Sequence, residues 1–574
     1  MINRSIINLF CTICCVLFCG FIVYFPLTDS DIWWHLAAGR EMAAHRHFMY
    51  HDPFSFTTNG ASWYNLHWVF QLAVYAVFRA AGLQGLVLFK CLVFVAACLL
   101  AFFAIPARRN AFVSMTVFCL LVYGVRYQVN ERPLLFSLVF IAGYIFLIER
   151  FLAGKKTGFL WALVPLQVLW TNSQGLFLLG PAIAAAYLAG GMLDGMLARH
   201  RGAANVPPLP DGRLSGGGNA RLFVMLSIAL LAACLVNPYG IKSFAFAARL
   251  LGCIVPSPAN VYSSGISENV PLFSTLGTPG ARYGVLTLLV TCTVAFSFLA
   301  GPRAVRSAHA VLAFMFLCLA IMAERNVILY FFVCAPIFSY NLAGLFDYQG
   351  IRGIISRPPV TITLAGCAAV ALAAYVFSHA LMLSQCPKRT LLSPFRFPTG
   401  AIAVLREHPV PGTVFNTDRY GGYLLWEFYP PERVFIDGRF TLRGPRFLGD
   451  YLAMLGDPGV HFDDACTRWG ISRVIMQTSV FPVYNRLAAF LYHSPHWRLV
   501  WADGSTALFI ADSLARMPRL DLGAPAEIKS IVSNLGGQWR DAPAIFREAL
   551  YHLANFLRMV GEIKSAEMVV DEMP

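Results

Sequence analysis

Charged residues are scarce in this sequence. They make up 13% of the 574 residues, whereas hydrophobic residues make up 57%, and soluble domains carry roughly 25% charged residues. This shortage excludes an ordinary soluble globular protein and indicates a membrane protein. Because backbone hydrogen bonds inside a bilayer must be satisfied within each segment, the spans are expected to be helices.

Acidic residues are scarcer than basic ones, and the formal net charge at pH 7 is +14. Nucleic-acid binding would require the basic residues to gather in a recognisable binding module. Here they lie in short loops between apolar runs, near residues 108–109, 155–156, 199–221, 303–306 and 352–357. Such loops mark the cytoplasmic side. We therefore expect no nucleic-acid partner, a cytoplasmic N-terminus and an extracytoplasmic C-terminal region.

The first apolar run, from Ile6 to Leu27, lacks a small-x-small cleavage site. This excludes a removable signal peptide and predicts a retained anchor. A bilayer needs about 20 apolar residues per helix, and about eleven spans are expected. They lie near 6–27, 84–105, 110–126, 132–152, 158–174, 176–198, 220–237, 283–301, 308–324, 327–346 and 360–384.

Water-exposed cysteine motifs are lacking as well. Of the fifteen cysteines, twelve lie in or beside apolar runs, where a thiol packs as a small hydrophobe. The Cys11-x-x-Cys14 spacing is therefore interpreted as packing. Three cysteines on the expected outer side allow at most one internal disulfide there, for example Cys386 with Cys466.

The chain divides into three expected domains. Residues 1–384 form an α-helical polytopic membrane domain with an outer loop at 28–83, residues 385–515 an extracytoplasmic α/β domain, and residues 516–574 a helical tail. The α/β domain is predicted from β-like runs at 413–415, 433–436, 472–476, 497–501 and 506–510. The tail resembles one tetratricopeptide helix pair, with an apolar face formed by Phe546, Ala549, Leu550, Leu553 and Leu557. The Pro- and Gly-rich stretch 202–218 is expected to be a cytoplasmic loop.

Polar chemistry is densest just after the first span. Asp29 and Asp31 lie there at the expected membrane surface, within reach of a lipid head group. If a helix begins near Ser30, Asp31 and His35 share a face. A carboxylate desolvated by the membrane can act as a general base, and the imidazole would orient it. The alternative is that Asp29 only caps the helix and the tryptophans form an interfacial belt.

The same loop is rich in histidine. Five of the thirteen histidines lie between Asp31 and Trp68, which allows a divalent metal ion to be held by Asp29, Asp31 or Asp52 with an imidazole. No pair has a strong ligand spacing, so the alternative is that these side chains reach toward the interface. The candidate sugar or acceptor contacts in this loop are Trp34, Asp52, Asn65 and His67.

Short motifs follow one another along this loop. After an acidic residue just past the first span come Ala37-Ala38-Gly39-Arg40-Glu41, Asp52-Pro53-Phe54-Ser55-Phe56-Thr57, Gly60, Trp63-x-Asn65-x-His67-Trp68 and Gln71. The series resembles the first outer loop of the C-type membrane glycosyltransferases, and most of all the protein mannosyltransferase and aminoarabinose transferase branch with its bacterial relatives. Those relatives tend to carry Asn-His-Glu-Trp where this chain has Asn65-Leu66-His67-Trp68, so an acidic side chain is absent here.

The resemblance implies a transfer reaction. A sugar would pass from a polyprenyl-phosphate donor to an envelope acceptor, on the outer face of a bacterial inner (plasma) membrane. Asp31 matches the position of the catalytic carboxylate best, and Asp29 would be its partner or a metal ligand. The resemblance covers the topology of roughly the first 350 residues and one loop in detail.

A polyprenyl phosphate requires cations at the outer surface, because guanidinium groups match phosphate oxygens. The expected topology places Arg126, Arg132 and Arg325 there, and Arg325 is the preferred ligand. The alternative is that these arginines anchor span ends and pair with Glu131 and Glu324.

Further candidates lie on the same expected side. Asn172 and Gln174 stand in a turn between two short spans, where irregular backbone lines cavities, and they would touch a sugar hydroxyl. Glu268 is a second ligand or acceptor contact, or else a solvated loop charge. In the soluble part, Asp437 follows a β-like run, a position at which loops often carry function.

Three classes of function remain open. The first is a lipid-carrier-dependent glycosyltransferase, favoured by the acidic pair. The second is a transporter, which would place charges at mid-membrane, and Lys90 is the clearest such charge. The third is a scaffold or assembly protein, or a catalytically silent relative of the glycosyltransferases, which the helical tail keeps open.

Overall fold

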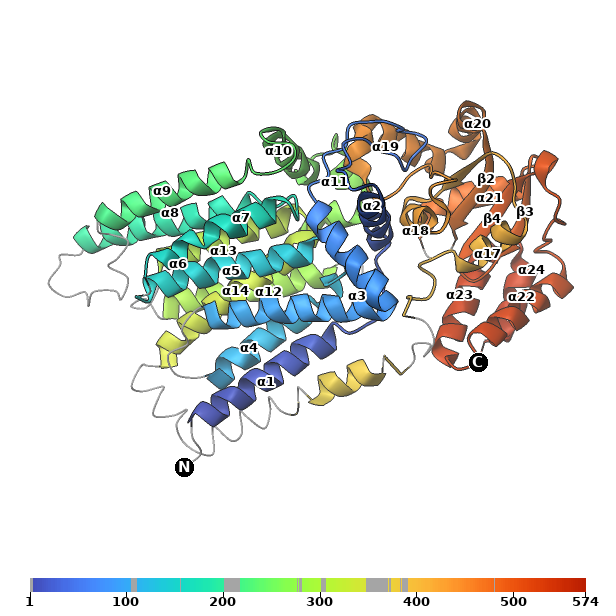
Figure 1. Ribbon diagram of the computed structural model, residues 1–574. Coiled ribbons are helices and arrows are strands. Elements are labelled where there is room, and N and C mark those ends of the chain that lie inside the picture. The colour runs from blue at the N-terminus through green and yellow to red at the C-terminus, as the bar shows by residue number, and fades with distance from the viewer. Residues whose placement is uncertain are drawn as a thin grey trace. The chain divides into compact units, whose positions relative to one another are not determined.

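The structure is a computed structural model in which the chain divides into two compact units (Figure 1). Unit 1 comprises Met1–Tyr24, Leu66–Phe70 and Val87–His379, and unit 2 comprises Phe25–Asn65, Gln71–Leu86 and Ala380–Pro574. Except for Leu66–Phe70, the loop 28–83 thus belongs to the same unit as the C-terminal part of the chain. The described residues are 4–104, 111–154, 156–200, 217–275, 277, 281–300, 306–346, 370, 373–381, 383–384, 391–478 and 481–573.

Unit 1 is built from helices. Its α-helices are α1 (Arg4–Ile22), the two ends of α3 (Trp68–Ala104), α4 (Ala111–Gly124), α5 (Leu134–Leu152), α6 (Gly158–Trp161), α7 (Leu163–Thr171), α8 (Leu179–His200), α9 (Gly217–Ala233), α10 (Lys242–Ile254), α11 (Val261–Gly265), α12 (Ala281–Ala300), α13 (Ser307–Met322) and α14 (Val327–Phe346). Short 3-10 turns lie between them at η1 (Arg126–Gln128), η2 (Ser267–Asn269), η3 (Leu272–Thr275) and η4 (Glu324–Asn326).

Three described helices, α3, α5 and α12, are long and apolar enough to cross a membrane. Shorter apolar helices lie at 12–22, 158–171, 221–233 and 307–322. Helices coincide with the first ten expected spans, while most of 360–384 lies outside the described residues. The total of about eleven spans therefore stays a prediction.

Close helix packing in unit 1 depends on small residues. A Cβ at Gly190 of α8 would lie 2.2 Å from the backbone nitrogen of Ala308 on α13, so only glycine permits this approach. A Cβ at Gly180 would collide with the Gln167 side chain. The buried aromatic rings of Tyr144 and Trp170 fill the space between α5 and α7.

Unit 2 contains a four-stranded sheet in the order β1-β2-β4-β3. Its strands are β1 (Thr413–Asn416), β2 (Ile471–Gln477), β3 (Trp497–Ala502) and β4 (Thr506–Ala511). The first two strands are parallel and the other pairs are antiparallel. Every residue of β2 is buried, as expected of a central strand that is covered on both faces.

Helices complete unit 2. They are α2 (Asp31–His45), α17 (Thr399–Glu407), α18 (Asp418–Phe428), α19 (Phe440–Gly456), α20 (Pro458–Trp469), α21 (Asn485–His493), α22 (Pro525–Gln538), α23 (Pro543–Met559) and α24 (Ile563–Asp571), with 3-10 turns η5 (Pro482–Tyr484) and η6 (Asp512–Leu514). Within α3, Gly82 has φ 57° and marks a kink, a conformation that glycine adopts at low cost.

Two secondary-structure predictions for unit 2 need correction. Residues 433–436 form no strand: Val434 makes only an isolated parallel bridge with Ser55, because its partner is a loop and not the sheet. The tail holds three helices instead of a pair. Its expected apolar face is confirmed in part, since four of the five residues are buried and Phe546 is half-buried.

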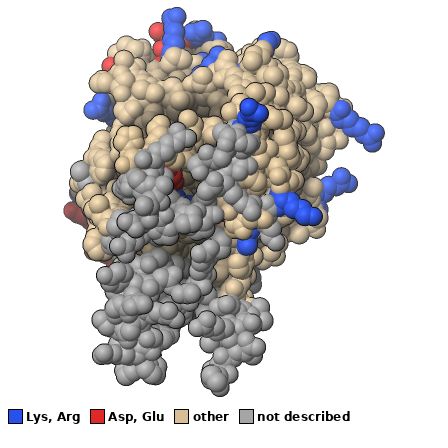
Figure 2. Space-filling model, turned by 90° about the vertical axis from the view of Figure 1, so that its left-hand side faces the viewer, with Lys and Arg blue, Asp and Glu red and all other residues tan. Residues whose placement is uncertain are grey.

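Other predictions fall outside the described residues. Cys386 and most of the loop 202–218 lie outside the described residues. The flexible loop and the Cys386–Cys466 disulfide therefore stay predictions. In the space-filling view, Lys and Arg side chains are scattered over the visible face and neutral residues cover most of it (Figure 2). On the described part of that face the cations form no continuous patch.

Candidate functional site

The acidic pair lies at the start of α2 in unit 2. The Asp29 carboxylate is buried, and its Oδ1 accepts a hydrogen bond from the backbone nitrogen of Asp31 at 3.0 Å. Asp29 therefore satisfies one free N–H group of the first helical turn, as the capping alternative expects. Asp31 is half-buried, so one carboxylate is held by the fold while the other retains access to solvent.

Asp31 packs against the backbone of the C-terminal part of the unit. A Cβ at Gly438 would lie 2.0 Å from Asp31 Oδ1, and a Cβ at Gly422 on α18 would lie 2.6 Å from the Ser30 carbonyl oxygen. Glycine is thus required at position 422, whereas a side chain at position 438 would force the Asp31 carboxylate to move. The start of α2 is enclosed by two segments nearly 400 residues later in the chain.

His35, Asn65 and Gln71 form a buried polar group beside α2. The Gln71 and Asn65 amides exchange two hydrogen bonds of 2.9 and 2.7 Å. The Gln71 Nε2 also lies 3.4 Å from His35 Nδ1. Since this amide nitrogen can only donate, Nδ1 accepts and a neutral ring carries its proton on Nε2. The indole of Trp34 lies 3.6 Å from the imidazole, centroid to centroid.

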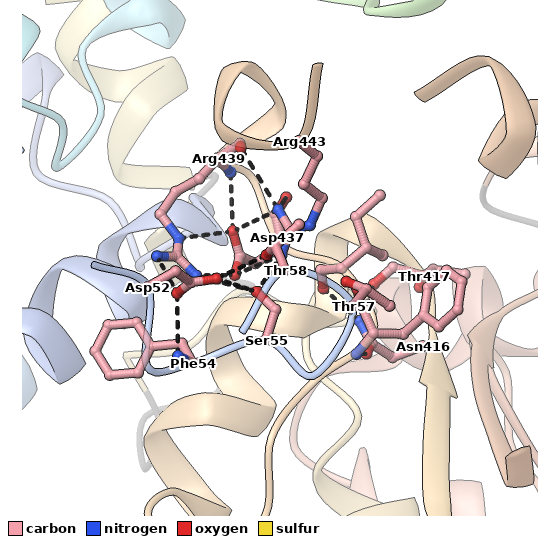
Figure 3. A network of polar contacts seen from close by, with 12 residues as sticks. Asp52, Phe54, Ser55, Thr57, Thr58, Asn416, Thr417, Asp437, Arg439 and Arg443 are labelled. Atoms are coloured by element: carbon pink, nitrogen blue, oxygen red, sulfur yellow. Dashed lines mark hydrogen bonds and ion pairs between the residues drawn. The ribbon is translucent and has the colours of Figure 1, made fainter. Parts of the chain in front are cut away.

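A buried ionic network joins the first outer loop to the segment after Asp437 (Figure 3). Asp52 Oδ1 accepts hydrogen bonds from the backbone nitrogen of Phe54 at 3.0 Å and from Arg439 at 2.8 Å. The other oxygen, Oδ2, accepts from the hydroxyls of Ser55 at 2.7 Å and Thr58 at 2.8 Å. Three of these four contacts are made within residues 52–58, and the fourth is made with Arg439.

Arg439 is the centre of this network. Its guanidinium donates to both oxygens of Asp437, at 2.9 and 2.6 Å, as well as to Asp52, and its Cζ lies 4.6 Å from the Trp63 ring centroid. Burial opposes the charge of Asp437, but the charges of Arg439 and Arg443 outweigh it and lower the pKa of Asp437. Burial likewise opposes the charge of Arg439, while Asp437 and Asp52 raise the pKa of Arg439.

The network forms a clamp. Asp52, Asp437 and Arg439 are buried, and Arg439 is bonded to both carboxylates. Because Gly438 lies between two clamp residues, the clamp fixes the backbone against which Asp31 rests. Asp52 was predicted to contact the sugar or acceptor; it is buried within the clamp, and that contact stays a prediction.

The predicted phosphate ligands lie in unit 1. Arg132 forms an ion pair with Glu268, and Lys90 forms one with Glu131 at 2.8 Å. The Arg126 guanidinium lies 3.7 Å from the Tyr123 ring centroid.

The turn that carries Arg126 lies beside the turn that carries Arg325. Gln128 of η1 donates a hydrogen bond to the Glu324 carbonyl and accepts one from the Ile328 nitrogen. The charge on Arg325 also opposes the effect of burial, which raises the pKa of the Cys253 thiol. The two turns therefore gather cations at one end of unit 1.

The polar turn after α7 is tied to its surroundings. Asn172 accepts a hydrogen bond from the Trp68 indole at 2.9 Å and donates to the carbonyls of Val168 and Val236. Gln174 Oε1 accepts from Ser137 at 3.1 Å. These amides shape the turn, and their contact with a sugar stays a prediction. Next to this turn, burial lowers the pKa of His67 to about 4, which keeps the imidazole neutral at pH 7.

Sequence reasoning missed a buried cluster within unit 1. Glu149 of α5 pairs with Arg306, and its Oε1 lies 2.9 Å from His309 Nε2 and 2.8 Å from the Tyr187 hydroxyl. An acid inside the apolar run 134–152 was the available signal. Near α1, the sulfur atoms of Cys15, Cys19 and Cys119 lie within 4.8 Å of one another, although Cys119 is distant in sequence.

The chain was compared with known proteins. No protein-family model matches it, and no curated protein matches it by sequence. Among solved structures, the crystal structure of the oligosaccharyltransferase of Archaeoglobus fulgidus in the apo form matches 84% of this chain and 71% of its own, at 12% identity and a TM-score of 0.53.

A second structure extends this likeness. The archaeal oligosaccharyltransferase AglB from Archaeoglobus fulgidus, in complex with an inhibitory peptide and a dolichol-phosphate, matches 97% of this chain and 84% of its own, at 11% identity and a TM-score of 0.58. At such low identity the likeness concerns the fold. The chain therefore shares the fold of the archaeal oligosaccharyltransferase AglB.

Proposed function

We propose that this protein transfers a sugar from a polyprenyl-phosphate-linked donor to an acceptor on the extracytoplasmic face of a bacterial inner membrane. The observation that carries the proposal is the combination of an oligosaccharyltransferase fold over 97% of the chain with two carboxylates at the start of α2. The similar archaeal structure was solved with a dolichol-phosphate, which supports a lipid-linked donor here.

Asp31 is the proposed catalytic carboxylate. It is half-buried at the start of α2 and held against Gly438, whereas Asp29 is buried and bonded to the helix. In an inverting displacement, Asp31 accepts the proton of the acceptor group. The acceptor atom then forms a bond to the sugar C1, the bond from C1 to the donor phosphate oxygen breaks, and the phosphate leaves on its lipid.

A divalent metal ion fits the donor set at this position. Asp29 and Asp31 supply carboxylate oxygens, which suit Mg²⁺ or Mn²⁺. These two residues would hold the ion, and a bound ion would supply positive charge to the leaving phosphate. The Asp31 carboxylate would also orient the acceptor.

Reconstitution tests the proposal. The purified protein is placed in liposomes with radiolabelled polyprenyl-phosphate sugars and a membrane extract, and label transfer is compared between the wild type, Asp31→Asn and Asp464→Asn. Asp464 is an exposed carboxylate on α20, so its replacement changes the net charge equally. We expect transfer by the wild type and by Asp464→Asn, and a loss of roughly 100-fold or more in Asp31→Asn.

Two results would contradict the proposal. Equal transfer by wild type and Asp31→Asn would remove Asp31 from the chemistry and leave the transfer reaction standing. Absence of transfer from every donor tested would favour the silent-relative, scaffold or transporter alternatives.

A further inference from the structure

Two arginines of unit 2 share one aromatic ring. The Arg419 guanidinium carbon lies 3.8 Å from the centroid of the Phe481 ring, and that of Arg396 lies 5.5 Å from it. Both arginines are half-buried. Two cations at one ring repel each other, and the ring's own attraction for them is modest.

The backbone brings Arg396 close to the acidic pair. Leu27 donates a hydrogen bond from its nitrogen to the Leu391 carbonyl at 2.7 Å, and its carbonyl accepts one from the Ser393 nitrogen at 2.8 Å. The two segments run parallel at this point. Asp29 lies two residues after Leu27, and Arg396 lies four residues after Leu392, its partner in the parallel bridge.

The residue before Arg396 has a strained backbone. Phe395 has φ 62°, which is a costly conformation for a bulky residue and is found preferentially at functional sites. Its carbonyl accepts a hydrogen bond from Gln477 at 3.2 Å, and its ring lies 5.2 Å from His552 and 6.1 Å from Trp539. These contacts keep Phe395 in its strained conformation. The fold thereby fixes the path of the backbone into Arg396.

Arg419 lies in the first turn of α18, where the helix dipole adds partial positive charge. The carboxylate of its neighbour Asp418 accepts hydrogen bonds from the hydroxyls of Tyr451 at 3.0 Å and Tyr484 at 2.7 Å. The acid nearest in sequence is thus used to fix the end of the helix.

Within the described part of the chain, neither Arg396 nor Arg419 forms an ion pair with a carboxylate. Burial and then the charge of Arg419 lower the pKa of Arg396, while the charges of Asp29 and Glu548 act in the opposite direction. An anion between the two guanidiniums would relieve their repulsion.

We propose that Arg396 and Arg419 bind the phosphate group of the lipid-linked donor beside Asp29. Two guanidiniums provide several N–H donors in planar forks, which match phosphate oxygens. This assignment rests on the proposed function. It places the phosphate contact on a pair of arginines in unit 2, whereas the sequence favoured Arg325, and Arg132 is already paired with Glu268.

A binding measurement tests the assignment without requiring transfer. The full-length protein in nanodiscs of zwitterionic lipid is titrated with radiolabelled polyprenyl phosphate, and separately with polyprenol and with inorganic phosphate as competitors. The variant Arg396→Gln/Arg419→Gln is compared with Arg516→Gln/Arg540→Gln, which removes the same charge from exposed positions. A third variant, Arg396→Lys/Arg419→Lys, keeps the charge but loses the forked donors.

We expect polyprenyl phosphate to bind the wild type and the Arg516/Arg540 variant equally, and the Arg396/Arg419 glutamine variant roughly 10- to 100-fold more weakly at an unchanged melting temperature. The lysine variant should lie between them, and polyprenol should not compete. Competition by inorganic phosphate alone, at the same affinity, would identify a free-phosphate site and overturn the assignment to a lipid.

The outcomes separate the two proposals. Equal binding by the wild type and the Arg396/Arg419 glutamine variant would overturn the phosphate assignment, even if sugar transfer is intact. Loss of binding in that variant alone would support it, even if no donor yields transfer. Absence of polyprenyl phosphate binding to the wild type would overturn the assignment, and the transfer assay would then decide the function independently.

Discussion

The Asp31 carboxylate and Gly438 lie so close together that a methyl group at position 438 would stand 2.0 Å from Asp31 Oδ1. No side chain larger than hydrogen fits there unless the carboxylate moves. The position of the proposed catalytic group is therefore set by the C-terminal part of unit 2 as much as by its own helix.

Gly438→Ala should displace Asp31 and reduce sugar transfer roughly 100-fold, because a shift of about 1 Å in a reacting group has effects of that size. Gly449→Ala on α19 is the matched control, since a Cβ there has nothing within 4 Å. Initial rates in the reconstituted assay measure the effect. Similar rates for the two variants would show that the exact position of Asp31 is unimportant.

Arg439→Gln should destabilise unit 2 by about 3–5 kcal/mol, because it leaves the buried Asp52 and Asp437 without their shared cation. Arg446→Gln, at an exposed position of the same helix, should change stability by less than about 0.5 kcal/mol. Thermal denaturation and limited proteolysis in detergent measure both. If Arg439→Gln unfolds the protein altogether, Arg439→Gln combined with Asp52→Asn and Asp437→Asn should recover part of the loss.

Acid should weaken unit 2 through Asp437. Its pKa is lowered in the fold by Arg439 and Arg443 against the effect of burial, so its contribution is complete above the ordinary value of 3.8 and is lost as the pH falls below it. Asp503 acts in the opposite direction, because burial raises its pKa. Stability should therefore fall below about pH 4 more clearly in Asp503→Asn than in wild type, as followed by thermal denaturation. A flat profile in Asp503→Asn would contradict the role of Asp437.

Removal of divalent metal ions should abolish transfer if Asp29 and Asp31 hold a metal as proposed. Incubation with a chelator should reduce the rate, and Mg²⁺ or Mn²⁺ should restore it, while Zn²⁺ fits a carboxylate pair less well. Asp29→Asn should raise the metal concentration required for half-maximal rate. Full activity after chelation would leave Asp29 with its capping role alone.

Much of the helical architecture was predictable from periodic apolar runs, since α5, α12 and α14 almost coincide with spans expected from hydropathy. The strand prediction failed at 433–436, because a short apolar run does not reveal whether its partner is a sheet or a loop. Val434 pairs with Ser55 of the first loop, a contact that local sequence cannot indicate.

The candidate site was predictable only in part for a related reason. Asp29 and Asp31 were found because they follow an apolar span, and the histidine and amide of the same loop, His35 and Asn65, do meet through Gln71. The clamp was missed because Asp52 and Arg439 are separated by 387 positions. Arg396, which lies outside the expected spans, gave no signal against the basic background of the chain.

The same separation has a consequence for the order of assembly. At about 5–20 residues per second, Asp52 leaves the ribosome roughly 20 to 80 seconds before Arg439, 387 positions later. Until Arg439 has been synthesised, Asp52 has no cationic partner, and its carboxylate stays hydrated. The first loop can complete these contacts only after residue 439 of the 574 has been synthesised, so a truncation before that position would remove the cationic partner of Asp52.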